Sequence, residues 1–488
     1  MGIVINQSIK NTVITYIGFA IGAINTLFMY PHFLGDDFYG LTNYILSSAN
    51  VIFPLMAFGV HNTLIKFFSE YKTEKEKSQF FSFILAIPLL AIVPIFFLGT
   101  IFYPEIATFL SKKNNIVYDY VWQIPIIGLC MAYFEIFYAW VKVHLQSVFG
   151  NFIKEVGLRI LISIFLFGVY YNFITVEQFI TATMYVYLAS MLIMFFYANK
   201  VQTIQFSFKL PTNTKPIIIY SSFIILSGSV ANILIDIDKT MLNQYLDLKQ
   251  IAYYTVAGFI ATVIAVPSRA MHQITYPITA KLMIENKHDE LNDLYKKTSI
   301  TLQIVGGLVY VGLLVNINQI YLLLPENYRG GVFVFFIIGL SKYFDLILGN
   351  NNAIIFNTKY YRMVLYLGLM LVVLTVILNM IFIPIFGIFG SAFATLLSIT
   401  LYSLAKLMFV VKRLHLYPFT KQTLYSLGLT FVLFLAFYFW ELPVNPIIGI
   451  GIKSIFVTIA YVYLNYKFVI SSQINEVMDG FIQKYLKR

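Results

Sequence analysis

The chain has 488 residues, of which 59% are hydrophobic and only 11% are charged. Soluble globular domains carry about 25% charged residues, so this chain lacks the charge to cover a water-facing surface. The composition predicts an all-α polytopic membrane protein and excludes a soluble one.

Fourteen apolar segments are each long enough for a transmembrane helix of about 20 residues. They lie near residues 10–31, 41–65, 80–103, 117–141, 152–172, 178–199, 216–238, 250–273, 298–323, 331–356, 361–383, 388–411, 422–440 and 446–467. The first segment is followed by Tyr30-Pro31-His32 and by no small-residue cleavage site. We therefore expect it to be a retained helix and not a signal peptide.

The basic residues set the expected orientation. Of the 33 Lys and Arg, 24 fall in loops on the side of the N-terminus, five fall on the opposite side, and four fall within spans. This asymmetry predicts that both termini are cytoplasmic, because cytoplasmic loops are enriched in Lys and Arg. The formal charge of +11 is then explained by the basic cytoplasmic loops, which excludes nucleic acid as a partner.

The sequence offers no chemistry outside the membrane. Every connection between spans is short, and no metalloprotease, P-loop or nucleophile-elbow motif is present. Cys130 is the single cysteine, and the six histidines are scattered, so no metal or other cofactor is expected. Whatever this chain does, it does within its spans.

An internal repeat relates the two halves of the chain. The loop 33–42 after the first span and the loop 245–254 after the seventh share a leucine, a short acidic turn and a small residue. Because six spans separate the copies, both have the same orientation, which predicts a parallel repeat about an axis along the membrane normal. We expect lobes at 1–199 and 216–411, a cytoplasmic linker at 200–215, and two further helices with a cytoplasmic tail at 412–488.

Polar residues follow one face of the first span of each copy. In the seventh span these are Ser229, Asn232, Asp236, Lys239 and Asn243, which recur at steps of three and four. The first span repeats the pattern more weakly and includes Asn25. We expect both stripes to line a central cavity, with Asp238 off the stripe.

Residues 383–398 read IPIFGIFGSAFATLLS. They resemble the IP-x-x-GI-x-G-[AS]-A-x-A-T-x-x-S signature of polysaccharide exporters of the multidrug/oligosaccharidyl-lipid/polysaccharide (MOP) superfamily, and fourteen spans resemble its O-antigen and lipid II flippase branches. The glycines and small residues favour an architectural role for the motif itself, in a tight turn and close helix packing. The resemblance implies a bacterial inner-membrane flippase for a polyprenyl-diphosphate-linked oligosaccharide, with a surface polysaccharide or O-antigen repeat unit favoured as its glycan.

That substrate implies cations in the cavity, because Arg and Lys are the side chains that hold phosphate. The candidates are Lys66, Arg159 and Arg269, each of which is open to a second interpretation as a residue that only sets topology.

Charged pairs inside spans are candidates for coupling. Lys342 and Asp345 share a face at i,i+3, as a self-neutralising pair or as a charge that changes partner during transport. Asp236 and Lys239 form either a coupling-ion site, for H⁺ or Na⁺, or a structural pair at the outer end of the span. Glu135 is the carboxylate of the first lobe nearest in position to Asp345.

Other functions remain open at this stage. They are a lipid II flippase, a cation-coupled exporter of drugs or small molecules, a membrane-embedded glycan polymerase, and a scaffold in a polysaccharide assembly complex. The polymerase is disfavoured because such enzymes generally need a sizeable outer loop, and the outer loops here are short. Membrane lipids and other polysaccharide-assembly proteins are the further expected partners.

Overall fold

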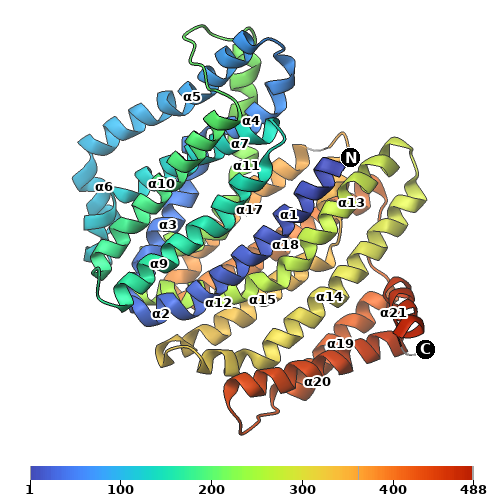
Figure 1. The fold of residues 1–488 in the computed structure, drawn as a ribbon. Helices are drawn as coiled ribbons and strands as arrows, with labels where there is room; N and C mark the ends of the chain where they lie inside the picture. Colours follow the sequence, from blue (N-terminus) through green and yellow to red (C-terminus); the bar gives the residue numbers. More distant parts are fainter. Residues whose placement is uncertain (1, 361, 486–488) are drawn as a thin grey trace. The chain divides into compact units, whose positions relative to one another are not determined.

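The computed structural model describes residues 2–360 and 362–485, apart from the side chains of 2–6, 8, 9, 91, 95, 226–235, 270, 273, 477, 481, 482, 484 and 485. Within these ranges the regular structure is entirely helical, which confirms the predicted all-α class (Figure 1). Ten of the described helices are long and apolar enough to cross a membrane, and a bent pair raises the number to 11. Each of the fourteen predicted spans falls mostly on helical residues within the described ranges, and the count of fourteen stays a prediction.

The chain divides into two compact units, Met1–Thr255 and Val256–Arg488. The repeat and the predicted boundaries at 1–199, 200–215, 216–411 and 412–488 stay predictions.

The helices of unit 1 are α1 (Gly2–Ile24), η1 (Asn25–Met29), α2 (Tyr30–Phe33), α3 (Asp36–Ala57), α4 (Val60–Phe67), η2 (Phe68–Glu70), α5 (Glu74–Ile101), α6 (Tyr103–Leu110), η3 (Asn115–Tyr120), α7 (Gln123–Val143), α8 (Ser147–Phe152), η4 (Ile153–Gly157), α9 (Leu158–Tyr170), α10 (Val176–Val201) and α11 (Thr214–Leu242). The division falls within α12 (Leu248–Thr262).

Unit 1 is built around α3, which packs against α7 and α11 (Figure 1). Phe58 and Gly59 both have positive φ, and the axis bends by 44° between α3 and the helical stretch that begins at Val60. A side chain at Gly59 would lie 2.8 Å from the backbone oxygen of Ser221, so glycine lets α11 pass close to the bend. The hydroxyls of Thr63 and Ser221 then meet at 2.7 Å.

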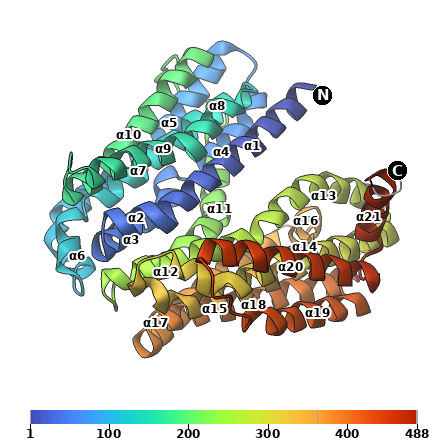
Figure 2. The ribbon, with the colours of Figure 1, turned by 60° about the horizontal axis from the view of Figure 1, so that its bottom comes forward.

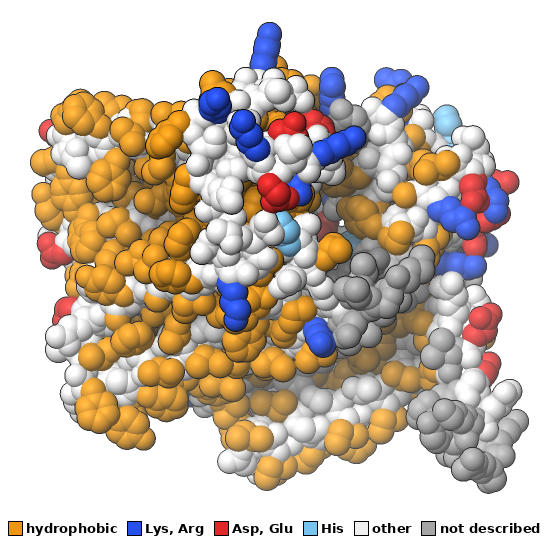
Figure 3. Space-filling view, turned by 45° about the horizontal axis from the view of Figure 1, so that its top comes forward, with side chains coloured by type: hydrophobic (Ala, Val, Ile, Leu, Met, Phe, Trp, Pro, Cys, Tyr) orange, Lys and Arg blue, Asp and Glu red, His pale blue; other side chains and the backbone are white. Residues whose placement is uncertain are grey.

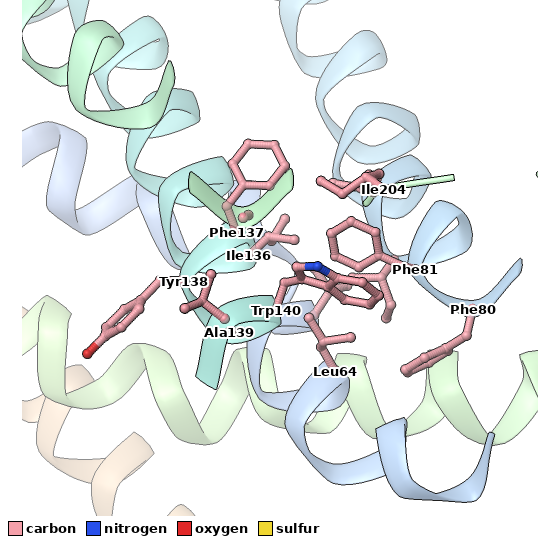
Figure 4. Packing of buried hydrophobic residues seen from close by; sticks show 14 of the residues in the cluster. Leu64, Phe80, Phe81, Ile136, Phe137, Tyr138, Ala139, Trp140 and Ile204 are labelled. Atoms are coloured by element: carbon pink, nitrogen blue, oxygen red, sulfur yellow. The ribbon is translucent and has the colours of Figure 1, made fainter. Parts of the chain in front are cut away.

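A large apolar cluster packs where α4, α5 and α7 meet. Trp140 lies against Phe81, with ring centroids 4.1 Å apart, and Figure 4 shows both beside Leu64. The indole N–H of Trp140 donates to the carbonyl of Gln202, so its polar atom is satisfied inside the cluster. This packing fixes the end of α7 that carries Glu135.

The helices of unit 2, after α12, are η5 (Val263–Ala265), α13 (Val266–Ile284), α14 (His288–Leu322), η6 (Glu326–Gly331), α15 (Val332–Ile347), α16 (Asn351–Phe356), α17 (Arg362–Phe386), α18 (Ile388–Leu414), α19 (Lys421–Tyr438), α20 (Pro446–Lys467) and α21 (Ser472–Tyr485). The long helix α14 contacts α15, α19 and α20, while α18 packs against α15 and α17 (Figure 2).

Two glycines join α17 to α18 tightly. Gly387 has φ of +60° at the turn, a conformation that other residues rarely adopt. A side chain at Gly390 would collide with the backbone carbonyl of Phe382, so glycine lets the two helices touch there. The structure thus confirms the architectural role predicted for residues 383–398.

Wide areas of the surface are apolar (Figure 3). Helix α5 alone exposes several large apolar side chains, among them Leu90, Val93 and Phe97. Exposed apolar surface of this extent is stable in lipid and not in water, as expected of helices that cross a membrane.

Gly390→Ala is expected to destabilise the protein by about 1–3 kcal/mol, because its methyl group overlaps the Phe382 carbonyl and must push α18 off α17. The measurement is the melting temperature in detergent. Gly428→Ala on α19 is the control, since a side chain there meets no atom within 4 Å among the described residues, and it should melt at or above the wild-type temperature. Equal melting of both variants would contradict the role given to Gly390.

Candidate functional site

Arg159 of α9 lies along a glycine face of α1. Side chains at Gly18 and Gly22 would meet the guanidinium of Arg159, at 2.8 Å and 3.1 Å respectively. The guanidinium Nη1 lies 3.4 Å from the Glu155 carboxylate, and 32% of the Arg159 side chain is accessible. Within unit 1, the two small residues therefore make room for an accessible cation beside an apolar helix.

Asn25 holds the backbone of Arg159 in place. The Asn25 side-chain amide donates to the carbonyl of Arg159 at 3.0 Å, and the hydroxyl of Ser163 lies 2.8 Å from both that carbonyl and Asn25 Oδ1. Asn25 begins the π-helical turn η1, and Arg159 follows the π-helical turn η4. Turns of this kind are frequent at functional sites. Asn25 thus positions Arg159 through helix packing.

Asp236 has two side-chain partners near the end of α11. Lys239 Nζ lies 2.6 Å from Asp236 Oδ1, and Ser47 of α3 donates to the same oxygen at 3.0 Å. Tyr187 of α10 interacts electrostatically with both Asp236 and Arg159. The structure therefore places Asp236 and Lys239 in direct contact, while the side chain of Asn232 lies outside the described residues.

Asp238 has separate surroundings, in line with its predicted place off the polar stripe. Its carboxylate accepts a hydrogen bond of 2.6 Å from the hydroxyl of Tyr254. Sequence reasoning did not find Ser47 or Tyr254. Each is one polar group on a different helix, and no spacing within α11 points to either of them.

Glu135 of α7 forms an ion pair of 2.5 Å with Lys154 of η4. His61 interacts electrostatically with Glu135, Lys142 and Lys154, so these four groups form one charged cluster. Lys66 is exposed instead, with its ammonium 3.8 Å from the ring centre of Tyr220. Of the three predicted diphosphate-binding residues, Arg159 and Lys66 therefore belong to unit 1.

A second charged cluster joins α15 and α18 in unit 2. Lys406 Nζ lies 3.5 Å from Asp345 Oδ1, and Ser403 donates to the same carboxylate oxygen at 3.3 Å. Lys406 also donates to the Asn352 side chain and lies 4.2 Å from the ring centre of Tyr402. The Lys406 side chain is 3% accessible and that of Asp345 is 51% accessible, so the carboxylate is the partner that solvent or a ligand reaches.

The ion-pair partner of Asp345 is Lys406 and not Lys342, so the self-neutralising pair of Lys342 and Asp345, one of two interpretations, is not found among the described residues. Lys342 lies close enough to Asp345 to interact electrostatically, but the ion pair found among the described residues is with Lys406. Lys406 is buried on α18 and has no other carboxylate within ion-pair distance in the described ranges, whereas Lys342 is partly exposed. The sequence feature that could have indicated this partner is Lys406 itself, which is a lone cation in an apolar run with Tyr402 and Ser403 one turn before it.

His272 and Arg269 lie on α13. His272 interacts electrostatically with both Asp345 and Lys406, which adds a titratable group to this cluster. Arg269 is exposed, and no ion pair is found for it in the part of the chain that the structure describes. The described residues contain no group of three His, Cys, Asp or Glu side chains arranged to hold a metal ion.

The chain has the fold of MOP-superfamily transporters. It is similar to the lipid II flippase MurJ in an inward closed conformation, with a TM-score of 0.73 and 16% identity over 95% of this chain and 100% of that one. It is also similar to a multidrug resistance MATE transporter of the MOP superfamily, inward-facing, with a TM-score of 0.64 and 14% identity over 83% of this chain and 98% of that one.

The sequence is similar to one curated relative over part of its length. It is 27% identical to the Probable flippase AglR of Haloferax volcanii over 192 residues, which are 37% of this chain and 39% of that protein. The match therefore spans about two fifths of the relative. No protein-family model matches the chain. The predicted resemblance to the MOP superfamily is confirmed at the level of the fold, and the O-antigen branch stays a prediction.

The stability of two variants tests whether Lys406 or Lys342 is the main partner of Asp345. Asp345→Asn is expected to destabilise the protein by about 1–2 kcal/mol, because it leaves the buried Lys406 ammonium without its carboxylate; the cost is reduced by the accessibility of Asp345. Lys342→Gln should change the melting temperature in detergent much less. The opposite ranking would show that Lys342 is the working partner.

Proposed function

We propose that the chain is a flippase that moves a polyprenyl-diphosphate-linked oligosaccharide from the cytoplasmic to the outer leaflet by alternating access. The observation that carries the proposal is the accessible guanidinium of Arg159 beside Gly18 and Gly22, between two predominantly apolar helices. A cation so placed is costly in a membrane unless it serves an anionic ligand or a partner. The MurJ-like fold and the partial match to a Probable flippase support the same activity.

The substrate diphosphate is proposed to bind Arg159, with Lys66 and Arg269 as further contacts. The planar guanidinium donates two parallel hydrogen bonds to phosphate oxygens, which an ammonium does not. Glu155, 3.4 Å from Arg159, neutralises the guanidinium and is the group that the diphosphate must displace. The glycan is proposed to be a surface polysaccharide or O-antigen repeat unit.

Coupling to an ion, H⁺ or Na⁺, is proposed at the carboxylates inside the spans. The proposed cavity and coupling group consists of Asn25, Glu135, Asn232, Asp236, Lys239, Lys342 and Asp345. Asp345 is the member that an ion can reach most directly, because half of its side chain is accessible. A carboxylate in that setting takes up a cation most readily when its lysine partner is drawn to another anion.

The proposed setting is the bacterial inner membrane, with fourteen spans and both termini in the cytoplasm. The excess of basic residues in loops on the N-terminal side supports that orientation. Other proteins of polysaccharide assembly are proposed as partners because the flipped unit must be consumed on the outer face.

Two alternatives keep specific support. The similarity to MurJ favours lipid II as substrate, and the similarity to a MATE transporter favours a cation-coupled exporter of small molecules. The cationic character of Arg159 and Lys406 argues against cationic drugs, since like charges repel in a low-dielectric site.

Depletion of the protein in its host distinguishes these functions. We expect a complete sugar repeat unit on polyprenyl diphosphate to accumulate facing the cytoplasm, measured by extracting the lipid-linked pool and testing its accessibility. Accumulation of lipid II would identify the alternative glycan, and single units on the outer side would indicate a polymerase. An unchanged pool would contradict the flippase and favour the small-molecule exporter.

Arg159→Ala is expected to reduce glycan export about tenfold or more at normal membrane levels, because charge-assisted hydrogen bonds to the diphosphate are lost. Arg159→Lys should restore only part of the activity, since an ammonium lacks the bidentate geometry. Arg329→Ala is the matched control, because Arg329 also pairs with a glutamate, Glu326 at 2.9 Å, but lies on the exposed turn η6. Normal export by Arg159→Ala would contradict the site.

A further inference from the structure

The non-helical segment between α10 and α11 exposes a patch of large apolar side chains. Phe208 is fully exposed, and Phe206 and Leu210 are 68% and 69% exposed. One exposed apolar residue is ordinary, but three within five positions form a patch that water does not stabilise. We call residues 202–213 the linker loop and these three side chains its apolar patch.

Contacts at both ends fix the linker loop to unit 1. At its start, the side-chain amide of Gln202 donates to the Glu74 carboxylate at 3.0 Å. At its end, the side-chain amide of Asn213 donates to the Glu70 carboxylate at 3.4 Å. Ile204 is buried in the apolar cluster of Figure 4. The linker loop is therefore an ordered part of unit 1 that buries one apolar side chain and leaves the apolar patch outside.

Helix α5 sets the depth of the linker loop relative to the membrane. The Ser78 hydroxyl donates to the Gln205 carbonyl, and the backbone N–H of Ser207 donates to Ser82 Oγ at 2.9 Å. Ser78 directly follows the charged first turn of α5, and residues 78–101 contain no charged side chain. That run is longer than the about 20 residues that cross the hydrocarbon core, so its first turn lies where α5 enters the lipid. The middle of the linker loop is held at that level.

The charge around the apolar patch is positive. Lys200, Lys209 and Lys215 are exposed, and residues 200–215 contain no Asp or Glu. The carboxylates of Glu70 and Glu74 are occupied by the amides at the two ends of the linker loop. Lysines beside exposed aromatic and aliphatic side chains are typical of segments that lie in the surface of an anionic bilayer.

We propose that the linker loop docks on the membrane, with its apolar patch inserted among the lipids and the three lysines against anionic phospholipid headgroups. The apolar side chains provide affinity for any bilayer, and the lysines provide the preference for negative charge. In the proposed orientation this surface is the cytoplasmic leaflet. Because the linker loop leads directly into α11, docking also fixes where that helix begins.

Fluorescence of the full-length protein in lipid nanodiscs tests the insertion. Cys130→Ala removes the single cysteine, and Phe208→Cys then carries an environment-sensitive dye. We expect quenching of the dye by nitroxide-labelled lipids and about fivefold weaker quenching by aqueous iodide than at the matched control, Lys75→Cys. Lys75 is exposed in the charged first turn of α5, just before the level at which the linker loop is held.

The headgroup preference is measured with the same dye at position 208. Nitroxide-labelled phosphatidylglycerol is expected to quench it about threefold more strongly than labelled phosphatidylcholine, and added salt should reduce the difference. Replacing the three lysines of the segment together by glutamine should abolish the preference. Lys112→Gln is the control, because Lys112 is an exposed lysine beyond the opposite end of α5, and it should keep the preference.

Three results would overturn the proposal. Iodide quenching at position 208 equal to that at position 75 would place the apolar patch in water. Protection from iodide without quenching by labelled lipid would show that protein covers the patch. Equal quenching by the two labelled lipids would remove the role given to the lysines. None of these measurements involves transport, so their outcome is independent of the proposed function.

Discussion

The cost of an unpaired charge in hydrocarbon governs the arrangement of this protein. Six of the charges inside its spans meet that constraint by pairing: Asp236 with Lys239, Glu135 with Lys154, and Asp345 with Lys406. Two of these three pairs join different helices, so they also fix how the helices pack. Because neutralising a charge and fixing a helix are achieved by the same contact, the charged groups can be structural and functional at once.

Glycine makes those contacts reachable. Gly18 and Gly22 let the Arg159 side chain lie flat against α1, and Gly390 lets α18 reach the backbone of α17. In a membrane, where lipid is as apolar as the side chains, close approach of this kind drives helix association. The positions of the cations therefore depend on residues that carry no charge themselves.

The sequence was sufficient for whatever depends on one helix at a time. Hydropathy located the long apolar helices, periodicity separated Asp238 from Asp236, and the motif at residues 383–398 indicated both the tight turn between α17 and α18 and the class of fold. The sequence was insufficient to predict which side chains pair where two helices meet. The i,i+3 spacing suggested Lys342 as partner for Asp345, but Lys406 reaches that carboxylate from α18, 61 positions along the chain. The sequence placed Asn25 in a polar stripe, whereas in the structure its side-chain amide donates a hydrogen bond to the Arg159 carbonyl.

The asymmetry of the Asp345–Lys406 pair indicates which partner moves if an anion arrives. Lys406 is enclosed by Asn352, Tyr402 and the carboxylate, whereas half of the Asp345 side chain is accessible. Separating the pair therefore costs less when Asp345 is displaced, because it can be hydrated or turn toward Lys342, than when Lys406 is moved. Under the proposed function, Asp345 belongs to the coupling group, and movement of its carboxylate away from Lys406 would make it available to a cation. The accessible partner of the pair would then take up the coupling ion while the buried lysine stays in place.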